Sequence, residues 1–397
     1  MQLQAIAKAR PLPAPVSGTP GAALSAKLQP ISAAGDFEAL VAPFARSVFQ
    51  SALWLSTWLG TMPGPAVEGC YWLSVEEAGG EPVLALPLVL RRERSGRLLS
   101  TPDLGVSDYN PPLLGHPEIV ARQSAEALWN AIRPALPEAD LLHLKRMPLV
   151  LAGVPNPLVH HGFAVPDRIS GWVVDLPERW EHYFARLTPK MREKLGKCRR
   201  RFLRQPGARF KITEDAGEAI TWLRRFDSLQ RERIEDKGAP YILDQEPYAG
   251  FYRALARGGL PQKRVAMAAA LAGEEIVAVN FAVRDGTTAV YLRVANQFGP
   301  WAPMAPGLLV TEHLMQHLHA QGVRTFDFAM GDYAYKRRFG AERLPLVTVE
   351  IPLNTMSVPG AALRYFYRRL AVSPRMRALR DRWKNGRGTP PAPPSCD

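Results

Sequence analysis

The segment "AMGDYAYKRRFG", residues 329–340, brings together three side chains that can transfer protons or stabilise charge. Asp332, Tyr335 and Lys336 directly follow "RTFDF", a short run of alternating aromatic residues. A carboxylate can act as a general base, a phenol as a general acid and an ammonium as a partner for an anion. Asp332 also stands where it would cap a helix over "YAYKRRF". The segment therefore predicts a reactive rim, a capped helix, or both.

Other polar residues interrupt runs that are otherwise apolar and strand-like. Asn280 lies within "IVAVNFAV" and Asp327 within "TFDF", while Tyr291 and Arg293 alternate along "TTAVYLRVA". The alternation predicts that Tyr291 and Arg293 share one face of a strand. Burying such groups is costly without partners. They therefore predict a polar cavity or a satisfied network, for example one in which Arg293 or a nearby lysine pairs with Asp327.

The elements that must position these residues occur in the same order in both halves of the chain, namely strand, strand, strand, loop, helix, strand. In the first half we expect strands over 70–76, 82–92, 96–102 and 140–147, with a helix over 118–136. In the second half we expect strands over 264–271, 275–283, 287–295 and 324–330, with a helix that stops at Gly322. The shared order predicts a duplicated fold.

A strongly basic helix is predicted between the two halves. Thr188 before Pro189 is a good helix start. One stripe of the helix is cationic (Lys190, Lys194, Lys197, Arg201, Arg204), and the adjoining stripe is apolar (Met191, Leu195, Cys198, Phe202). Like charges at this spacing destabilise a helix. The ridge is either a solvated face or a site for an anionic partner, such as a nucleotide cofactor, an RNA or a phospholipid surface.

Bulk properties limit the remaining possibilities. A chain of 397 residues predicts two domains, and a net charge of +13 favours polyanionic partners. Three unrelated cysteines give neither a disulfide framework nor a metal cluster, and neither a signal peptide nor a run of roughly 18 apolar residues is visible. We therefore expect a cytoplasmic protein without a metal. Residues 1–34 and 385–397 have the composition of flexible tails. No GxSxG, Walker or GxGxxG motif occurs, which argues against hydrolase, P-loop and dehydrogenase chemistry.

The order of elements, ending in "FDFAMGDYAYKRRFG", resembles the GNAT-fold acyltransferases. It is most similar to the CelD/BcsL branch, which is associated with cellulose biosynthesis. The supporting motifs are Ser107-Asp108-Tyr109 in the first half, and Phe326-Asp327-Phe328, Gly331-Asp332 and Tyr335-Lys336 in the second. "SALWLSTWLG", residues 51–60, also fits. The resemblance covers roughly residues 36 to 370.

The resemblance implies an α/β (α+β) fold with two tandem GNAT-like lobes, over residues 35–165 and 166–384, as in Fem-type ligases. Each lobe would hold a mixed, largely antiparallel sheet flanked by helices. Acetyl-CoA or another acyl-CoA would insert where two strands of the second lobe separate, with its pyrophosphate at a helix N-terminus. The implied cofactor-binding residues are Val294, Asn296, Gln297, Pro306, Gly307 and Leu308. Prolines in this loop remove N–H donors, which leaves an acyl carrier protein or a charged tRNA open as the donor.

The implied function is transfer of an acyl group to an amine of a small molecule or a cell-envelope precursor. Asp332 would be the base, Tyr335 the acid, and Lys336 would hold an anionic group. The implied substrate-binding residues are Asn280, Tyr291, Arg293, Asp327, Asp108 and Tyr109. Two alternatives remain open. One is Fem-like aminoacyl transfer from tRNA, and the other is a non-catalytic accessory or polyanion-binding protein.

Overall fold

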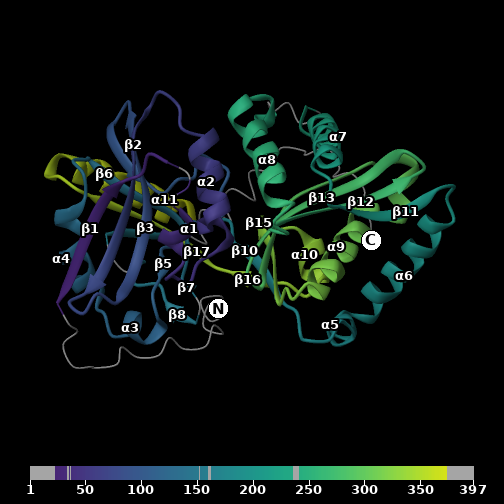
Figure 1. Ribbon diagram of the computed structural model, residues 1–397, viewed down its shortest axis with the longest axis horizontal. Coiled ribbons are helices and arrows are strands. Elements are labelled where there is room, and N and C mark those ends of the chain that lie inside the picture. Colours follow the sequence, from purple (N-terminus) through teal and green to yellow (C-terminus); the bar gives the residue numbers. More distant parts are fainter. Residues whose placement is uncertain are drawn as a thin grey trace.

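The structure, a computed structural model, describes residues 23–33, 35, 37–151, 153–159, 162–235 and 241–372. It consists of two mixed α/β lobes side by side, each built on one large sheet (Figure 1). All strand pairs in the two large sheets are antiparallel except one pair in each. The predicted fold class, two lobes with largely antiparallel sheets flanked by helices, is confirmed.

The first sheet runs in the order β1-β2-β3-β4-β6-β17-β9, and β5 pairs with β3. Its strands are β1 (Leu24–Pro30), β2 (Val67–Glu77), β3 (Pro82–Glu93), β4 (Gly96–Ser100), β5 (Leu113–Leu114), β6 (Leu141–Pro148), β9 (Phe163–Pro166) and β17 (Leu346–Pro352). The helices of this lobe are α1 (Phe37–Val41), α2 (Ala52–Thr61), α3 (Pro117–Ala121), α4 (Ala125–Ala135) and α11 (Val358–Val372). A separate two-stranded ribbon joins β7 (Val150–Leu151) to β8 (Val154–Pro155).

The second sheet runs in the order β11-β12-β13-β14-β15-β10-β16. Its strands are β10 (Gly171–Asp175), β11 (Ala208–Thr213), β12 (Val265–Ala272), β13 (Glu275–Asp285), β14 (Thr288–Asn296), β15 (Thr325–Met330) and β16 (Glu342–Leu344). Two helices, α7 (Ala216–Glu235) and α8 (Glu246–Gly259), pack on one face. The other face is covered by α5 (Trp180–Arg186), α6 (Pro189–Leu203) and α9 (Pro306–Ala320) (Figure 1). The short helix α10 (Ala334–Arg338) follows β15.

The predicted order of elements is present in both lobes, and it ends in each with the same parallel strand pair. In the first lobe β4 pairs with β6 over Leu98–Ser100, and in the second β14 pairs with β15 over Thr288–Val290. After three residue pairs the two strands of each pair separate. One predicted element differs, because the helix expected over 118–136 is two helices. Ser124 caps the second of them by accepting a hydrogen bond from the Ala127 N–H at 3.0 Å.

The sheets do not follow the domain boundaries expected from the sequence. Residues 24–30, assigned to a flexible tail, form β1, which pairs with β2 along its whole length. The overall composition of residues 1–34 is rich in Pro, Ala and Gly, and this composition outweighed the short run of alternating residues that forms the strand. Residues 346–372, assigned to the second lobe, return to the first, where β17 lies between β6 and β9. Residues 1–22 and 373–397, which include the expected tail at 385–397, lie outside the described residues.

The two lobes share one hydrophobic core at their junction. Trp54 and Trp58 of α2 are buried in the same cluster as Phe251 of α8, and the rings of Trp54 and Phe251 meet edge to face at 4.9 Å. The chain also crosses directly between the sheets from β9 to β10 and from β16 to β17. The "SALWLSTWLG" segment therefore forms part of the inter-lobe contact. A shared core of this kind holds the two lobes in a fixed relation.

Candidate active site

The Ser107-Asp108-Tyr109 loop of the first lobe docks onto the end of β15 in the second. The Asp108 carboxylate accepts the Met330 N–H at 3.0 Å, and the Tyr109 hydroxyl donates to Asp327 Oδ1 at 2.9 Å. Both Tyr109 and Asp327 are buried. The two motifs that carried the sequence resemblance therefore meet in space. Their polar atoms bond to one another, and no side chain fits at Gly171, where a Cβ would collide with the Tyr109 ring.

Lys336 is the fourth member of this contact between the lobes. We call the group of Asp108, Tyr109, Asp327 and Lys336 the inter-lobe joint. Its Nζ donates to the carbonyl oxygens of Ala329, at 3.1 Å, and Met330, at 2.7 Å, and the residue is only 1% exposed. Ala329 has φ 58°, a left-handed backbone that residues with a Cβ rarely adopt. The ammonium thus holds a strained turn at the end of β15. Lys336 was expected to hold an anionic ligand, and the structure places it on two carbonyls and near the carboxyls of Asp327 and Asp108 instead.

Burial changes the titration of this cluster. It lowers the pKa of Lys336 to about 8 and raises the pKa of Asp327 to about 7. It also raises the pKa of Asp108. Each carboxyl favours the charged lysine, and the lysine in turn favours ionised carboxyls. The joint is therefore a coupled set of buried acids around one ammonium.

Asp332 and Tyr335 lie at the rim just beyond the joint. Asp332 is exposed, and its carboxylate accepts from Arg337 Nη1 at 2.5 Å. It does not cap α10, since the N-cap residue is Tyr333 and no side-chain cap bond forms there. The capping interpretation of Asp332 is wrong because the chain makes one more extended residue before the helix begins. Tyr335 is half-buried and stacks on Tyr333, with ring centroids 6.0 Å apart.

A bulge in β14 changes the predicted arrangement of Tyr291 and Arg293. Phe281 pairs with Arg293 and Ala282 with Tyr291, so Leu292 is an extra residue in the ladder. Tyr291 packs with the α9 side of the sheet, whereas Arg293 turns toward α7. The expectation that they share a face is therefore wrong. A bulge also leaves backbone groups outside the ladder, beside the place where β14 and β15 separate.

Arg293 belongs to a satisfied network and not to a pair with Asp327. Its guanidinium donates to Asp227 at 2.6 Å and to the Tyr241 hydroxyl at 2.8 Å. The same guanidinium lies over the Phe226 ring, 4.1 Å from its centroid. Because the partner of Asp327 is Tyr109, the suggested Arg293–Asp327 pair is wrong. Arg293 joins β14 to α7 in the interior of the lobe.

A polar chain leads from the interior to Tyr335. Asn280 contacts Thr311 of α9 at 3.1 Å, and the Thr311 and Tyr291 hydroxyls lie 2.9 Å apart. The Tyr291 hydroxyl in turn bonds to that of Tyr335. Burial, together with Tyr335, holds the pKa of Tyr291 well above its usual value. The separation between β14 and β15 is thus lined by hydroxyl groups and aromatic rings, with Tyr291 5.8 Å from Phe328.

Residues 189–337 match the acetyltransferase (GNAT) domain family. The matched segment, called the GNAT domain below, contains the bulge, the separating strands and Tyr335. A search of curated proteins found no match.

The whole two-lobe chain is similar in fold to several solved structures. The structure of FemX superposes with a TM-score of 0.59 at 10% identity, over 85% of this chain and 100% of that one. The C-terminal domain of a putative lysylphosphatidylglycerol synthetase from Agrobacterium fabrum gives 0.49 at 12% identity, over 84% and 95%. A tandem GNAT protein from the clavulanic acid biosynthesis pathway gives 0.44 at 14%, over 83% and 99%. At such identities the FemX likeness concerns the fold alone.

The expected cofactor cradle in the GNAT domain is a poor fit for a pyrophosphate. Pro306 has no N–H, and the Leu308 N–H is bonded to the Ala305 carbonyl at 3.0 Å. Among the first three residues of α9, Gly307 alone is left to offer a donor. Asn296 and Gln297 donate to backbone carbonyls, at 3.0 Å in each case. The Val294 carbonyl accepts from Gln230 at 3.3 Å.

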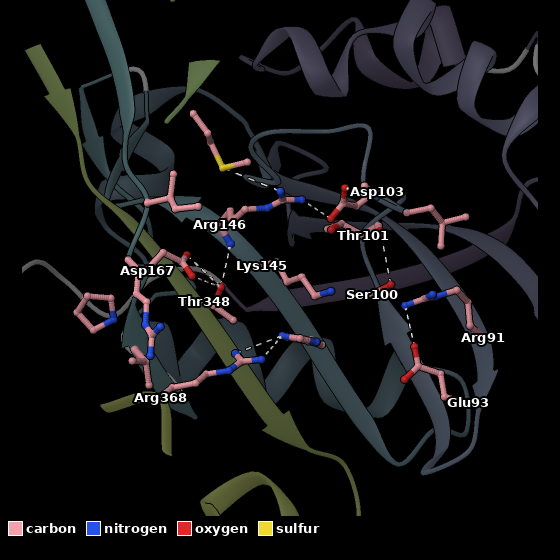
Figure 2. Close-up of a pocket in the computed structure, with 18 of the residues that line it drawn as sticks. Arg91, Glu93, Ser100, Thr101, Asp103, Lys145, Arg146, Asp167, Thr348 and Arg368 are labelled. Atoms are coloured by element: carbon pink, nitrogen blue, oxygen red, sulfur yellow. Dashed lines mark hydrogen bonds and ion pairs between the residues drawn. The ribbon is translucent and has the colours of Figure 1, made fainter. Parts of the chain in front are cut away.

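A cavity of about 1030 Å³ lies in the first lobe, where β4 and β6 separate (Figure 2). Its wall includes residues of β3, β4, β6, β17 and α11, and it is completed by Tyr248 and Met330 of the second lobe. Met330 is also the residue whose backbone bonds to Asp108 and Lys336. The cavity therefore adjoins the inter-lobe joint. None of the predicted site residues lines it.

The cavity is cationic. Arg146 pairs with Asp103, and Arg91 lies 3.1 Å from Glu93. Two further cations, Lys145 and Arg168, have no side-chain partner within the part of the chain that the structure describes. Beside Arg146, whose backbone N–H donates to Thr348 Oγ1 at 3.1 Å, the Thr348 hydroxyl donates to Asp167 at 3.0 Å, and burial raises the pKa of that carboxyl. The cavity is thus suited to a ligand with a negatively charged group.

The cavity residues were missed because they come from separate segments. Lys145 and Arg146 are adjacent basic residues in β6, an otherwise largely apolar strand. That irregularity is the one local signal that the sequence offered. Arg168 and Thr348 lie in segments that carry no motif. Among the described residues, no cluster of three or more His, Cys, Asp or Glu side chains could hold a metal ion.

The predicted basic helix exists as α6. Thr188 accepts the Met191 N–H at 3.2 Å, and the apolar stripe of Met191, Leu195, Cys198 and Phe202 is buried. Arg199 fixes the helix to α9 through Glu312 at 2.6 Å. Lys190, Lys197, Arg201 and Arg204 are exposed. No helix of the described residues is both long enough and apolar enough to span a bilayer.

Proposed function

We propose that this protein is an N-acyltransferase that moves an acyl group from an activated donor to an amine. The observation that supports this most is the separation of β14 and β15 beside the bulge at Leu292, within the GNAT domain. A bulged strand can present a backbone N–H to the oxyanion that forms at a carbonyl under attack. The relation to the CelD/BcsL branch, and to cellulose biosynthesis, remains part of this proposal and rests on the shared motifs alone.

In the proposed reaction the neutral amine attacks the donor carbonyl, a C–N bond forms, and the bond to the leaving group breaks. Asp332 takes the proton from the amine, and Tyr335 gives a proton to the departing thiolate or alkoxide. The Tyr291 and Thr311 hydroxyls behind Tyr335 offer a route for its reprotonation. Lys336 acts as a positioning residue, because it fixes the turn from which Asp332 and Tyr335 project.

The cationic cavity supports an acceptor that carries a phosphate or carboxylate beside its amine, as small molecules and envelope precursors do. Lys145→Met is expected to raise the KM for the acceptor about tenfold or more, because a charge-assisted contact is lost. The donor-induced thermal shift should not change. Steady-state kinetics of this variant and of the matched surface variant Lys27→Met would measure the effect. Equal KM values in both variants would contradict the assignment.

Acyl-CoA is the first candidate donor, since the GNAT fold implies it. In the first turn of α9 only the Gly307 N–H is free to contact it, because the Leu308 N–H and the Asn296 amide donate to backbone carbonyls. Aminoacyl-tRNA is the second candidate, and the exposed cations of α6 favour it, because a phosphate backbone would neutralise them. A non-catalytic accessory role is the alternative if neither donor binds.

A thermal-shift screen of the full chain separates the donors. A donor at a hundredfold excess over its Kd stabilises the folded state by about 2.7 kcal/mol. We expect a rise in the melting temperature with acetyl-CoA or longer acyl-CoAs for the first candidate, and with charged tRNA for the second. If neither raises it, the proposed function is wrong.

Two variants make the screen specific. Gly307→Ala would place a Cβ 2.8 Å from Asn296 Oδ1 and fill the cradle, so it should remove the CoA-induced shift alone. Lys197→Glu with Arg201→Glu reverses charge on the exposed ridge and should remove the tRNA-induced shift alone.

A further inference from the structure

Helix α11 is attached to the first lobe through its polar side. Arg364 Nε lies 2.8 Å from Glu350 Oε2, and Arg368 Nη2 lies 3.0 Å from Glu350 Oε1. Glu350, on β17, is 2% exposed. Tyr365 packs on Phe163 of β9, with ring centroids 5.6 Å apart. Two arginines and a tyrosine therefore attach α11 to β17 and β9, and both arginines stay partly exposed beside the helix.

The opposite face of α11 exposes a stripe of large apolar side chains. Leu363, Phe366, Tyr367 and Leu370 are 58%, 61%, 67% and 57% exposed. Their spacing of three, four and seven residues places them on one side of the helix. Met356, just before the helix, is 90% exposed. Contiguous exposed apolar surface marks an interaction site.

Cations surround the exposed stripe. Arg364 and Arg368 keep 42% and 38% of their side-chain surface exposed, and Arg369 is exposed beside them. The sequence beyond the helix, residues 373–397, adds six Lys or Arg and only two Asp. A second copy that packed the same stripe by two-fold symmetry would bring these arginines together. Anionic headgroups would neutralise them, as they do for amphipathic helices that lie in a membrane interface.

We propose that α11 docks on the surface of a bilayer that contains anionic phospholipid. Leu363, Phe366 and Leu370 enter the boundary between headgroups and acyl chains, and the arginines bind the headgroups. Tyr367 and Arg368 also line the cationic cavity, and Figure 2 shows Arg368 at its wall. Docking therefore brings the cavity to the headgroup layer. The inference concerns where the protein sits, and it stands apart from the identity of the donor.

Co-sedimentation of the full chain with vesicles tests the proposal. We expect binding to phosphatidylcholine vesicles that contain phosphatidylglycerol, weaker binding at high salt, and little binding to phosphatidylcholine alone. Phe366→Asp with Leu370→Asp should lower the partition coefficient at least about tenfold. Leu203→Asp is the matched control, because Leu203 at the end of α6 is 49% exposed and should leave binding unchanged.

A second measurement guards against a folding defect. Phe366→Trp should show a blue-shifted emission with the anionic vesicles, since the new indole leaves water. Three results would overturn the proposal. The wild-type chain fails to bind, the Phe366→Asp/Leu370→Asp variant binds as well as wild type, or binding is lost only when Lys197 and Arg201 of α6 are changed to Glu. A wild-type dimer that this double variant dissociates, without vesicle binding, would assign the stripe to a second copy instead.

Discussion

Tyr335→Phe is expected to lower kcat by about a hundredfold or more and to leave the melting temperature unchanged. A positioned general acid typically contributes 10²–10⁴-fold, on the order of the loss expected here. The substitution removes one oxygen from a half-buried ring and keeps its contacts with Phe328 and Tyr333. The Tyr291 hydroxyl retains Thr311 at 2.9 Å. The loss should therefore appear in the chemical step, measured as kcat under saturating donor and acceptor.

Tyr333→Phe is the matched control. Tyr333 is the stacked neighbour of Tyr335, is 53% exposed, and lies outside the hydroxyl chain from Asn280. Its loss of one oxygen should leave kcat close to that of wild type. Turnover that survives both Tyr335→Phe and Asp332→Asn would show that neither residue performs the proton transfers, even if the chain is an acyltransferase.

The strands and helices that carry local signals could be predicted. The runs 82–92 and 275–283 became β3 and β13 within two residues at either end. The signals for these strands are local, because their apolar residues and the turns that flank them lie within a few sequence positions of each other. The same holds for α6, where capping by Thr188 and two stripes at helical spacing were visible in fifteen residues. The motifs around Tyr109 and Asp327 were also recognised, but their direct contact was not.

What could not be predicted depends on distant pairing. The sequence "LVTVEIP" of β17 carries no signal for its pairing partner. That partner is β6, which ends at Pro148, about 200 residues earlier in the chain. The bulge at Leu292 is set by register with β13, so the alternation of Tyr291 and Arg293 pointed to the wrong geometry. The cavity cations, such as Lys145, come from separate strands and from α11, and they gather only when the first sheet is complete. These features are long-range consequences of strand order, which local patterns do not contain.

Lys336→Met is expected to lower the free energy of unfolding by about 3–5 kcal/mol at pH 8 and by clearly less at pH 5. Breaking a buried charge cluster at one member leaves the other charges uncompensated. At pH 8 the carboxyl of Asp327, with a pKa of about 7, is mostly ionised and depends on Lys336, which is still partly protonated there because its own pKa is about 8. At pH 5 Asp327 binds a proton, so the missing cation matters less.

The sign of the pH effect follows from the direction of the pKa shift. A carboxyl whose pKa is raised by folding adds stability below its unfolded pKa, near 3.8, and loses it as the pH rises through its folded value. Without Lys336 the pKa values of both carboxyls rise further. The loss of unfolding free energy in the variant, relative to wild type, therefore grows between pH 5 and pH 8. Urea unfolding at both pH values measures it, with the exposed Lys190→Met as the control.

Adding Asp327→Asn to Lys336→Met provides the decisive comparison. The amide keeps an oxygen that can accept from Tyr109 and from the Ala329 N–H, but it carries no charge at pH 8. We expect the double variant to recover part of the stability lost at pH 8 and little at pH 5. The stability that remains lost at both pH values is attributed to the carbonyl oxygens of Ala329 and Met330, because they no longer accept a hydrogen bond from the lysine. Equal losses at both pH values, with no recovery, would mean that Lys336 supports the joint through those carbonyls and packing alone.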